Sequence, residues 1–261
     1  MRKDAIQLEE SRLSDGDEIE MPHLHERHRA FPAVFENRQH RRILDLAAGV
    51  GYVARNIRDG YAAGQMFCND ISPSALVSLK ALGLPVVSYT LDHDWGGFPF
   101  KDGSFDALIA LATIEHIIQV DAFVQEIHRI LDDQGCFYVS APNYASLLYL
   151  SEIILTGRTF HNPLHPDTRY EFYAHVRYFT YRTMLEYLSS FGFVPEAVYL
   201  PLPQASTTYQ SIQARSPLKA LVFRQAMNFF YHLSPRWSSE PVICLRKSAN
   251  KNNRPFRKVI L

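Results

Sequence analysis

From residue 42 onward the chain alternates between short apolar runs and longer segments with apolar residues at helical spacing. The runs have the length and composition of strands, and the longer segments have the three- and four-residue spacing of amphipathic helices. The predicted strands are 42–47, 65–70, 85–90, 104–112, 135–143, 193–200 and 241–247. The predicted helices are 53–60, 72–83, 120–131, 146–155, 180–192 and 216–235. Because helices connect successive strands, the pattern predicts an α/β fold with a doubly wound, seven-stranded, mostly parallel sheet.

Changes in composition divide the chain into an extension, a domain and two insertions. Residues 1–40 are polar and are expected to form an N-terminal helical and loop extension of a domain that spans 41–261. Residues 144–178 are rich in aromatic side chains without a clear period, which favours a lid or substrate insertion. Residues 203–240 are predicted to be a helical insertion before the last strand. Its apolar helix, 217–233, is expected to be buried against the sheet or a dimer partner, and the alternative is an interfacial helix serving a lipid-linked substrate.

Charge and cysteine content exclude some classes of protein. The chain has 27 basic and 27 acidic residues, so no overall attraction to nucleic acid is expected. Its three cysteines, Cys68, Cys136 and Cys244, are far apart and form no CxxC pair, which favours free thiols in a reducing compartment. The first residues lack the apolar core of a signal peptide, and no apolar run is long enough for a transmembrane segment. A cytoplasmic protein is the expectation.

The segment LDLAAGVG joins the first strand to the first helix through two glycines. Gly49 and Gly51 allow the backbone to approach a ligand closely and expose amides at a helix N-terminus. Asp45 ends the first strand, and Asp70, 19 residues after Gly51, ends the second. An acid in that position can accept hydrogen bonds from both hydroxyls of a ribose. The segment therefore predicts a nucleoside-binding edge of the sheet, with Asp92 after the third strand where the base would lie.

Four motifs resemble a class I S-adenosylmethionine-dependent methyltransferase of type 11 or type 23. In chain order they are LDLAAGVG, CNDIS, FPFKDGSFDALIALATIEHI and EIHRILDDQGCFYVSAPN. The resemblance implies a Rossmann-like methyltransferase fold with helical and loop lid insertions, S-adenosylmethionine as cofactor, and methyl transfer as activity. A NAD(P) dehydrogenase is the natural competitor, but it would normally show G-x-G-x-x-G, whereas Tyr52, Val53 and Ala54 follow the glycine pair here.

The resemblance also implies a set of cofactor-binding residues. Asp45, Gly49 and Gly51 would lie on the methionine and ribose side, and Asp70 would take the ribose hydroxyls. Asp92 would lie beside the adenine, with Asp94 as the alternative. The remaining positions assigned to the cofactor are Ala47, Ile71, His93 and Leu111. Two positions depart from the family pattern. Ala47 stands where the first glycine is usual, and Ala112, beside Leu111, stands where many relatives carry a polar or acidic residue.

A second resemblance covers HVRYFTYRTMLEYLSSFGF, which begins at His175. It looks like the segment before the sixth strand in methyltransferases that act on sugars, lipid-linked glycans or quinone precursors. Tyr144, Arg177 and Tyr178 are expected to bind substrate, and packing of the lid is the alternative account of the two tyrosines.

A hydroxyl acceptor is a poor nucleophile near neutral pH and needs a base or a local field to lose its proton. His116 follows the fourth strand and His175 lies on the lid, so either is a candidate catalytic base. The structural alternative for His116 is that it orients a loop or the carboxylate of Glu115.

These observations favour transfer of a methyl group to a small-molecule, sugar or lipid-linked acceptor, with oxygen as the expected target. The alternative is a non-catalytic cofactor-binding scaffold of a biosynthetic complex, which Ala47 and Ala112 motivate. We expect a small-molecule or glycan substrate and no nucleic acid partner; peripheral membrane contact and a homodimer stay open. No metal is expected, because His23, His25 and His28 are loosely spaced and have no nearby cysteine or paired carboxylate.

Overall fold

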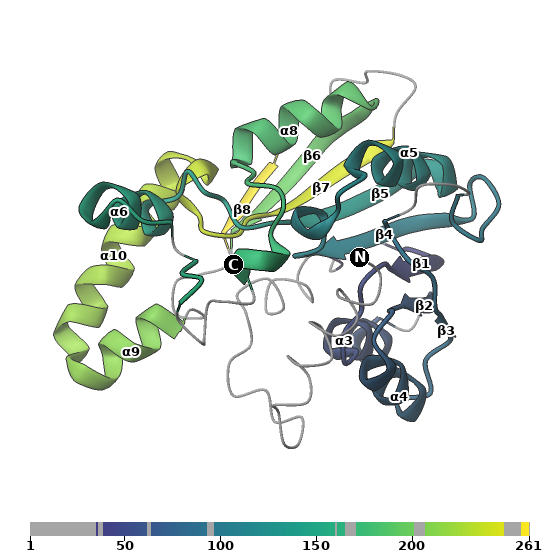
Figure 1. Ribbon diagram of the computed structural model, residues 1–261, viewed down its shortest axis with the longest axis horizontal. Coiled ribbons are helices and arrows are strands. Elements are labelled where there is room, and N and C mark those ends of the chain that lie inside the picture. Colours follow the sequence, from purple (N-terminus) through teal and green to yellow (C-terminus); the bar gives the residue numbers. More distant parts are fainter. Residues whose placement is uncertain are drawn as a thin grey trace.

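The computed structural model describes residues 35, 39–61, 64–92, 97–159, 161–164, 171–200, 207–247 and 257–260. They contain one eight-stranded sheet with the strand order β3-β2-β1-β4-β5-β7-β6-β8 (Figure 1). The strands are β1 Arg42–Asp45, β2 Gln65–Asn69, β3 Val86–Val87, β4 Phe105–Leu111, β5 Leu131–Ser140, β6 Phe193–Leu200, β7 Val242–Lys247 and β8 Arg257–Ile260.

The predicted sheet is confirmed, with one added strand. Strands β1 to β5 pair in parallel, and β7 runs antiparallel between β5 and β6. The eighth strand, β8, was not predicted and pairs in parallel with β6. Its four residues include Arg257 and Lys258, so the segment is too short and too charged to show a strand pattern. Pairing with the edge of β6 provides its backbone hydrogen bonds, and only the tertiary structure creates that edge.

Helices lie on both faces of the sheet, as expected for a doubly wound fold (Figure 1). The α-helices are α3 Tyr52–Gly60, α4 Pro73–Ala81, α5 Val120–Ile130, α6 Leu147–Thr156, α8 Tyr181–Ser190, α9 Thr207–Arg215 and α10 Pro217–Leu233. All six predicted helices are confirmed, and α9 was not separately predicted. The side chains of Ser72 and Thr180 cap α4 and α8, and Pro73 occupies the first turn of α4.

Two buried clusters form the core, one on each face of the sheet. Strand β4 contributes to both, because its alternating side chains point to opposite faces. Leu108 packs in the cluster that contains Val124 of α5 and Leu188 of α8. Ile109 packs in the cluster that contains Ile57 of α3. Burial on both faces explains why the sequence of β4 is almost continuously apolar.

Helix α10 differs from the expectation of a buried helix. Packing against the fold buries only Ala220 and Tyr231 within this helix. Five of its other large apolar side chains are exposed, namely Leu218 72%, Leu221 44%, Val222 63%, Phe229 61% and Leu233 61%, whereas Phe223, Met227 and Phe230 are partly buried. The expected burial of α10 against the sheet is therefore wrong for these positions. No helix among the described residues combines the length and apolar character needed to cross a bilayer.

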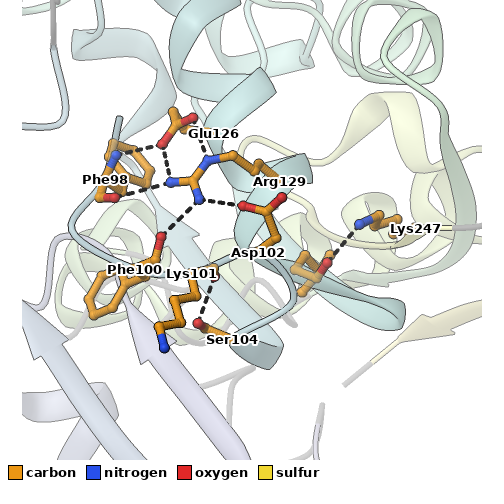
Figure 2. Close-up of polar contacts among 9 residues, drawn as sticks. Phe98, Phe100, Lys101, Asp102, Ser104, Glu126, Arg129 and Lys247 are labelled. Atoms are coloured by element: carbon orange, nitrogen blue, oxygen red, sulfur yellow. Dashed lines mark hydrogen bonds and ion pairs between the residues drawn. The ribbon is translucent and has the colours of Figure 1, made fainter. Parts of the chain in front are cut away.

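An ion-pair network holds α5 to the segment that precedes β4 (Figure 2). The guanidinium of Arg129 donates to Glu126, to Asp102 and to the carbonyl oxygens of Phe98 and Phe100. The Arg129 hydrogen bonds are the main reason that the pKa of Glu126 lies below its ordinary value. A hollow lined by Asp102, Gly103, Gln125, His128, Arg129, Asp132, Asp133 and Lys247 lies beside the network. It is at the edge where β4 and β5 begin, opposite the edge where ligands bind in such sheets.

Candidate functional site

The turn after β1 lies at the point where the strand order reverses. The chain leaves β1 for β2 and β3 on one side and returns to β4 on the other, so β1 and β4 are neighbours. Ligands of open α/β sheets bind beside the carboxyl ends of the strands at this kind of reversal. The loop after β1 and the loop after β4 therefore border the same crevice.

The two glycines of the turn serve different purposes. Gly49 has a φ of 53°, and a Cβ added there would meet no atom within 4 Å. Gly51 has a φ of 84°, and a Cβ there would lie 2.7 Å from the side chain of Leu79 on α4. Gly49 thus leaves open space at the carboxyl edge, whereas Gly51 permits α3 to begin against α4.

Asp70 connects this turn to the start of α4. Its Oδ2 accepts a hydrogen bond from the amide of Gly49 at 2.8 Å, and its Oδ1 accepts one from the amide of Ser72 at 2.9 Å. The carboxyl group is largely buried, with 8% of the residue exposed. Since a carboxylate oxygen has more than one acceptor site, these bonds orient Asp70 and do not exhaust its capacity to bind ribose hydroxyls.

Asp45 is a buried acid at the end of β1, with 4% of the residue exposed. Its pKa is raised to about 7, chiefly by burial; a hydrogen bond from the backbone of Ala47 opposes the rise, and the nearby charge of Asp70 adds to it. Two acids at neighbouring strand ends give this edge a negative potential when both are ionised. A cationic ligand would stabilise their ionised forms.

Asn69 completes the arrangement and was not identified from the sequence. Its side-chain nitrogen donates to the carbonyl oxygen of Leu46 at 2.9 Å, and its Oδ1 accepts from the amide of Tyr89 at 2.9 Å. The residue is 1% exposed. It therefore joins the loops that follow three adjacent strands. Its place directly before Asp70 is the signal that could have identified it.

The two alanines that depart from the family pattern behave differently. Ala112 has a φ of 46°, and no other non-glycine residue in the described ranges has a positive φ. Ala47 therefore does not require the conformation that favours glycine. Ala112 adopts this left-handed conformation, which costs a non-glycine residue about 1–3 kcal/mol. Its amide donates to the carbonyl oxygen of Ser140 at the end of β5, 3.0 Å away, which holds the loop after β4 against β5.

The other predicted cofactor positions are distributed around the same edge. Asp92 accepts hydrogen bonds from the amides of Ile118 and Gln119, just before α5, at 3.1 and 2.8 Å. Leu111 is the last residue of β4, and Ile71 directly follows Asp70; both are partly buried. His93 and the alternative Asp94 lie outside the described residues, as do His23, His25 and His28. The cofactor contacts of all these residues stay predictions.

A cluster of histidines and tyrosines lies beyond the ends of β4 and β5. The hydroxyl of Tyr144 is 2.8 Å from Nε2 of His161 and 3.0 Å from Nδ1 of His175. The rings of His116 and His175 are 4.8 Å apart, and the rings of Tyr144 and Tyr178 are 4.7 Å apart. The structure thus brings together both candidate bases and two of the predicted substrate-binding residues. His161 is an addition that the sequence did not indicate.

Burial sets the protonation of the tyrosine and of the added histidine. Burial raises the pKa of Tyr144 well above its usual range, so its hydroxyl keeps its proton. Burial also lowers the pKa of His161, which favours the neutral imidazole at pH 7. Tyr144 and His161 therefore present neutral hydrogen-bonding groups in a cluster that also holds the buried Glu115, which is 1% exposed.

The segment with His175 is attached to the loop after β4 by backbone bonds. The amides of Val176 and Arg177 both donate to the carbonyl oxygen of Glu115, at 2.9 and 3.1 Å. His116 Nδ1 is 3.0 Å from the carbonyl oxygen of Ala174. The guanidinium of Arg177 donates to the carbonyl oxygen of Ile118 at 2.7 Å, so this predicted substrate residue also has a structural contact. These bonds place residues 174–177 against the loop after β4.

Comparison with known proteins shows which domains this one resembles. Residues 44–139 match the family model described as a methyltransferase domain, type 11. The matched residues include the glycine turn, Asp70 and the loop after β4. Over these residues the chain is therefore similar to that methyltransferase family.

Two relatives show how far the similarity extends. The chain is 30% identical over 94 residues to the mitochondrial arginine hydroxylase NDUFAF5 of Homo sapiens, and the match covers 36% of this chain and 26% of the relative. It is 30% identical over 97 residues to the malonyl-[acyl-carrier protein] O-methyltransferase of Geobacter sulfurreducens, covering 37% of this chain and 36% of the relative. The matches thus span only about a quarter to a third of these relatives.

Solved structures share the fold over most of the chain. An S-adenosylmethionine-dependent methyltransferase of Thermotoga maritima has a TM-score of 0.57 at 14% identity, covering 85% of this chain and 89% of that one. One from Mesorhizobium loti has a TM-score of 0.53 at 19% identity, covering 82% and 95%. The [4+2]-cyclase SpnF has a TM-score of 0.53 at 19% identity, covering 85% and 81%.

The site residues fit S-adenosylmethionine, the cofactor of this class. The open space at Gly49 admits a ligand to the turn, and Asp70 offers a carboxylate to the ribose hydroxyls. The buried acid Asp45 suits a ligand that carries positive charge on its sulfonium and amino groups. When bound, the cofactor supplies an activated methyl group at the crevice.

Proposed function

We propose that this protein transfers a methyl group from S-adenosylmethionine to a hydroxyl oxygen of a small-molecule, sugar or lipid-linked acceptor. The observation that supports this best is the position of the histidine and tyrosine cluster. It follows β4 and β5, while the cofactor turn follows β1, the neighbour of β4. The acceptor would lie between the two groups.

In this proposal the acceptor oxygen attacks the methyl carbon, the bond between that carbon and sulfur breaks, and the hydroxyl proton leaves. S-adenosylhomocysteine, a methyl ether and a proton are the products. The role of the chain is mainly to hold the acceptor in line with the methyl group and to stabilise the developing charge. His116 and His175 would contact the acceptor oxygen, and Tyr144 and Tyr178 would line its site.

The exposed stripe on α10 supports a lipid-linked acceptor in particular. At about 100° per residue, Leu218, Val222 and Phe229 lie on one side of the helix, opposite the buried Ala220 and Tyr231. Lys219 borders the stripe on one side, Arg224 lies nearer the buried face, and the sequence has no acidic residue between 203 and 239. An exposed apolar stripe on a helix that carries basic and no acidic side chains is typical of a helix at an anionic lipid surface. We propose that α10 contacts such a surface.

The scaffold alternative has the same cofactor but no reaction. The names of two similar proteins, a hydroxylase and a cyclase, indicate that proteins with this domain or fold need not be methyltransferases. Ala47 no longer supports the alternative, because it requires no special backbone conformation. Ala112 still motivates it.

The test combines binding with turnover. Calorimetry should show binding of S-adenosylmethionine, and incubation with phenolic, sugar and lipid-linked glycan acceptors should yield S-adenosylhomocysteine together with an acceptor heavier by one methylene. Absence of cofactor binding would overturn the proposal. Cofactor binding without S-adenosylhomocysteine on any acceptor class would favour the scaffold. Transfer to nitrogen or carbon would overturn the assignment of oxygen.

A further inference from the structure

Three side chains in the cluster form a compact set of metal-binding groups. One ligand atom each from Glu115, His116 and His175 lies within 4.8 Å of the other two. Glu115 and His175 are buried, and His116 is partly buried. Two imidazoles and one carboxylate are a common protein ligand set for a transition-metal ion, with the remaining coordination positions available to substrate or water. We propose that Glu115, His116 and His175 bind a divalent transition-metal ion.

The hydrogen bonds of both histidines fit this assignment. Nδ1 of His116 contacts the carbonyl oxygen of Ala174 at 3.0 Å, and Nδ1 of His175 contacts the hydroxyl of Tyr144 at 3.0 Å. Metal-binding histidines commonly use their second ring nitrogen in this way, which fixes the tautomer and the orientation of the ring. We assign Nε2 of both rings to the ion. Ala174 and Tyr144 would then be its outer-shell partners.

The backbone keeps the three ligands together although 59 positions separate His116 from His175 in the sequence. Glu115 and His116 belong to a short 3-10 helix, Ile114–His116, directly after β4. The carbonyl oxygen of Glu115 accepts the amides of Val176 and Arg177, the two residues after His175. These bonds fix the lid segment against the loop before any ion binds. The set is therefore preorganised, which reduces the cost of binding.

A second group of ligand side chains is less suitable. Cys136, Glu196 and Cys244 also lie close enough to share an ion. However, Arg246 forms an ion pair with Glu196 at 2.6 Å, so a guanidinium already neutralises that carboxylate. The two thiols lie on β5 and β7 within the sheet, away from the crevice. They provide a control for the proposed site.

The consequence for catalysis rests on the proposed function. A divalent ion in this position would bind the acceptor oxygen as a Lewis acid and favour loss of its proton to water. His116 and His175 would then act as ligands, and neither would need to be the base. Metal binding itself does not depend on that role, so the two proposals can fail separately.

Metal binding is tested on the full chain after chelation and dialysis. Calorimetry with Zn²⁺ and Mn²⁺, and elemental analysis after desalting, should show one ion per chain. Glu115→Gln and His175→Asn should each weaken metal affinity on the order of 100-fold or more, and Tyr144→Phe about 10-fold because it removes an outer-shell contact. Cys244→Ser should leave metal affinity unchanged. Affinity for S-adenosylmethionine, measured in parallel, should change little in all four variants.

Each contrary result has a defined meaning. Wild-type protein that binds neither ion, or ligand variants that bind as the wild type does, would overturn the metal site. Loss of binding in Cys244→Ser alone would place the ion in the thiol group instead. If Glu115→Gln does not fold, as judged by circular dichroism, His116→Asn takes its place because that residue is only partly buried. Metal binding without S-adenosylmethionine binding would contradict the proposed function and leave the metal site standing.

Discussion

The amide of Gly49 donates a 2.8 Å hydrogen bond to Oδ2 of Asp70, and this bond ties the turn after β1 to the acid after β2. The second oxygen of the same carboxylate accepts from Ser72 at the cap of α4. One side chain therefore shapes the glycine turn and, in the proposed cofactor site, would accept hydrogen bonds from the ribose. This double use makes Asp70 the most informative position for testing the cofactor site.

Replacing Asp70 tests the cofactor site directly. Asp70→Ala removes a carboxylate whose charged hydrogen bonds to the ribose are worth about 1.5–3 kcal/mol. We expect affinity for S-adenosylmethionine to fall by about 10- to 100-fold, measured by calorimetry. Asp106→Ala is the matched control, because Asp106 also accepts two backbone amides but lies at the opposite edge of the sheet. Equal affinities for the wild type and Asp70→Ala would show that the assignment is wrong.

The pKa of Asp45 predicts a pH dependence of stability. Burial raises this pKa from 3.8 to about 7 in the folded state, so between these pH values the folded protein binds more protons than the unfolded chain. The contribution of Asp45 to stability therefore decreases as pH rises from about 4 to 7. Asp45→Asn, which has no proton to lose, should become more stable relative to wild type as pH rises through this window.

Urea unfolding of both proteins at several pH values, without cofactor, measures that difference. Asp59→Asn provides a comparison, because Asp59 is an exposed acid with 57% of its side chain accessible. A stability difference between Asp45→Asn and wild type that stays constant from pH 4 to 8 would contradict the raised pKa.

The Arg129 network predicts a local contribution to stability (Figure 2). Arg129→Ala removes hydrogen bonds to two carboxylates and two carbonyl oxygens, and 70% of the Arg129 side chain is shielded from solvent, since 30% is exposed. We expect a loss of about 1–3 kcal/mol in the free energy of unfolding. Arg182→Ala is the control, because its pair with Glu186 is exposed and such surface pairs contribute little to stability. Similar urea midpoints for the two variants would show that the network contributes no more than a surface pair.

The positive φ of Ala112 predicts an unusual response to glycine. Ala112→Gly relieves the strain of a left-handed conformation and should be neutral or stabilising by up to about 1 kcal/mol. Ala226→Gly, at an exposed position in α10, should instead cost about 1 kcal/mol because glycine lowers helix propensity. Thermal unfolding of both variants measures the contrast. A loss of stability in Ala112→Gly as large as that in Ala226→Gly would argue against the strained backbone.

The exposed stripe of α10 predicts binding to anionic vesicles. Sedimentation with phosphatidylcholine vesicles that contain phosphatidylserine should recover the wild type, and high salt should weaken this binding because Lys219, beside the stripe, contributes electrostatically. Val222→Gln and Phe229→Gln should reduce recovery, whereas Val77→Gln should not, since Val77 is 68% exposed on the distant helix α4.

Analytical ultracentrifugation tests the alternative that a second copy of this chain, and not a lipid surface, covers the stripe on α10. A stable dimer that Phe229→Gln dissociates, together with absence of vesicle binding, would assign α10 to a protein interface and overturn the lipid proposal.

Local patterns predicted most of the fold and the positions of the glycine turn, Asp45 and Asp70. The positions of the seven strands along the chain could be predicted from apolar runs separated by helices, because the period and composition of its own residues specify each element. The glycine turn, Asp45 and Asp70 could be identified for the same reason, since their spacing is fixed by one βαβ unit. The short strand β8 was missed because its pairing depends on a distant edge and its own four residues carry no pattern.

The tertiary structure decided which distant residues meet. Glu115, Tyr144, His161 and His175 are separated in the sequence and share no motif, yet they form one buried cluster because the lid segment returns to the ends of β4 and β5. Asn69 acquires its role only when three strand ends are adjacent. The exposure of α10 likewise depends on which face packs against the fold. The sequence determines local conformation through interactions between nearby residues, whereas burial and long-range contacts depend on the tertiary packing of the whole chain.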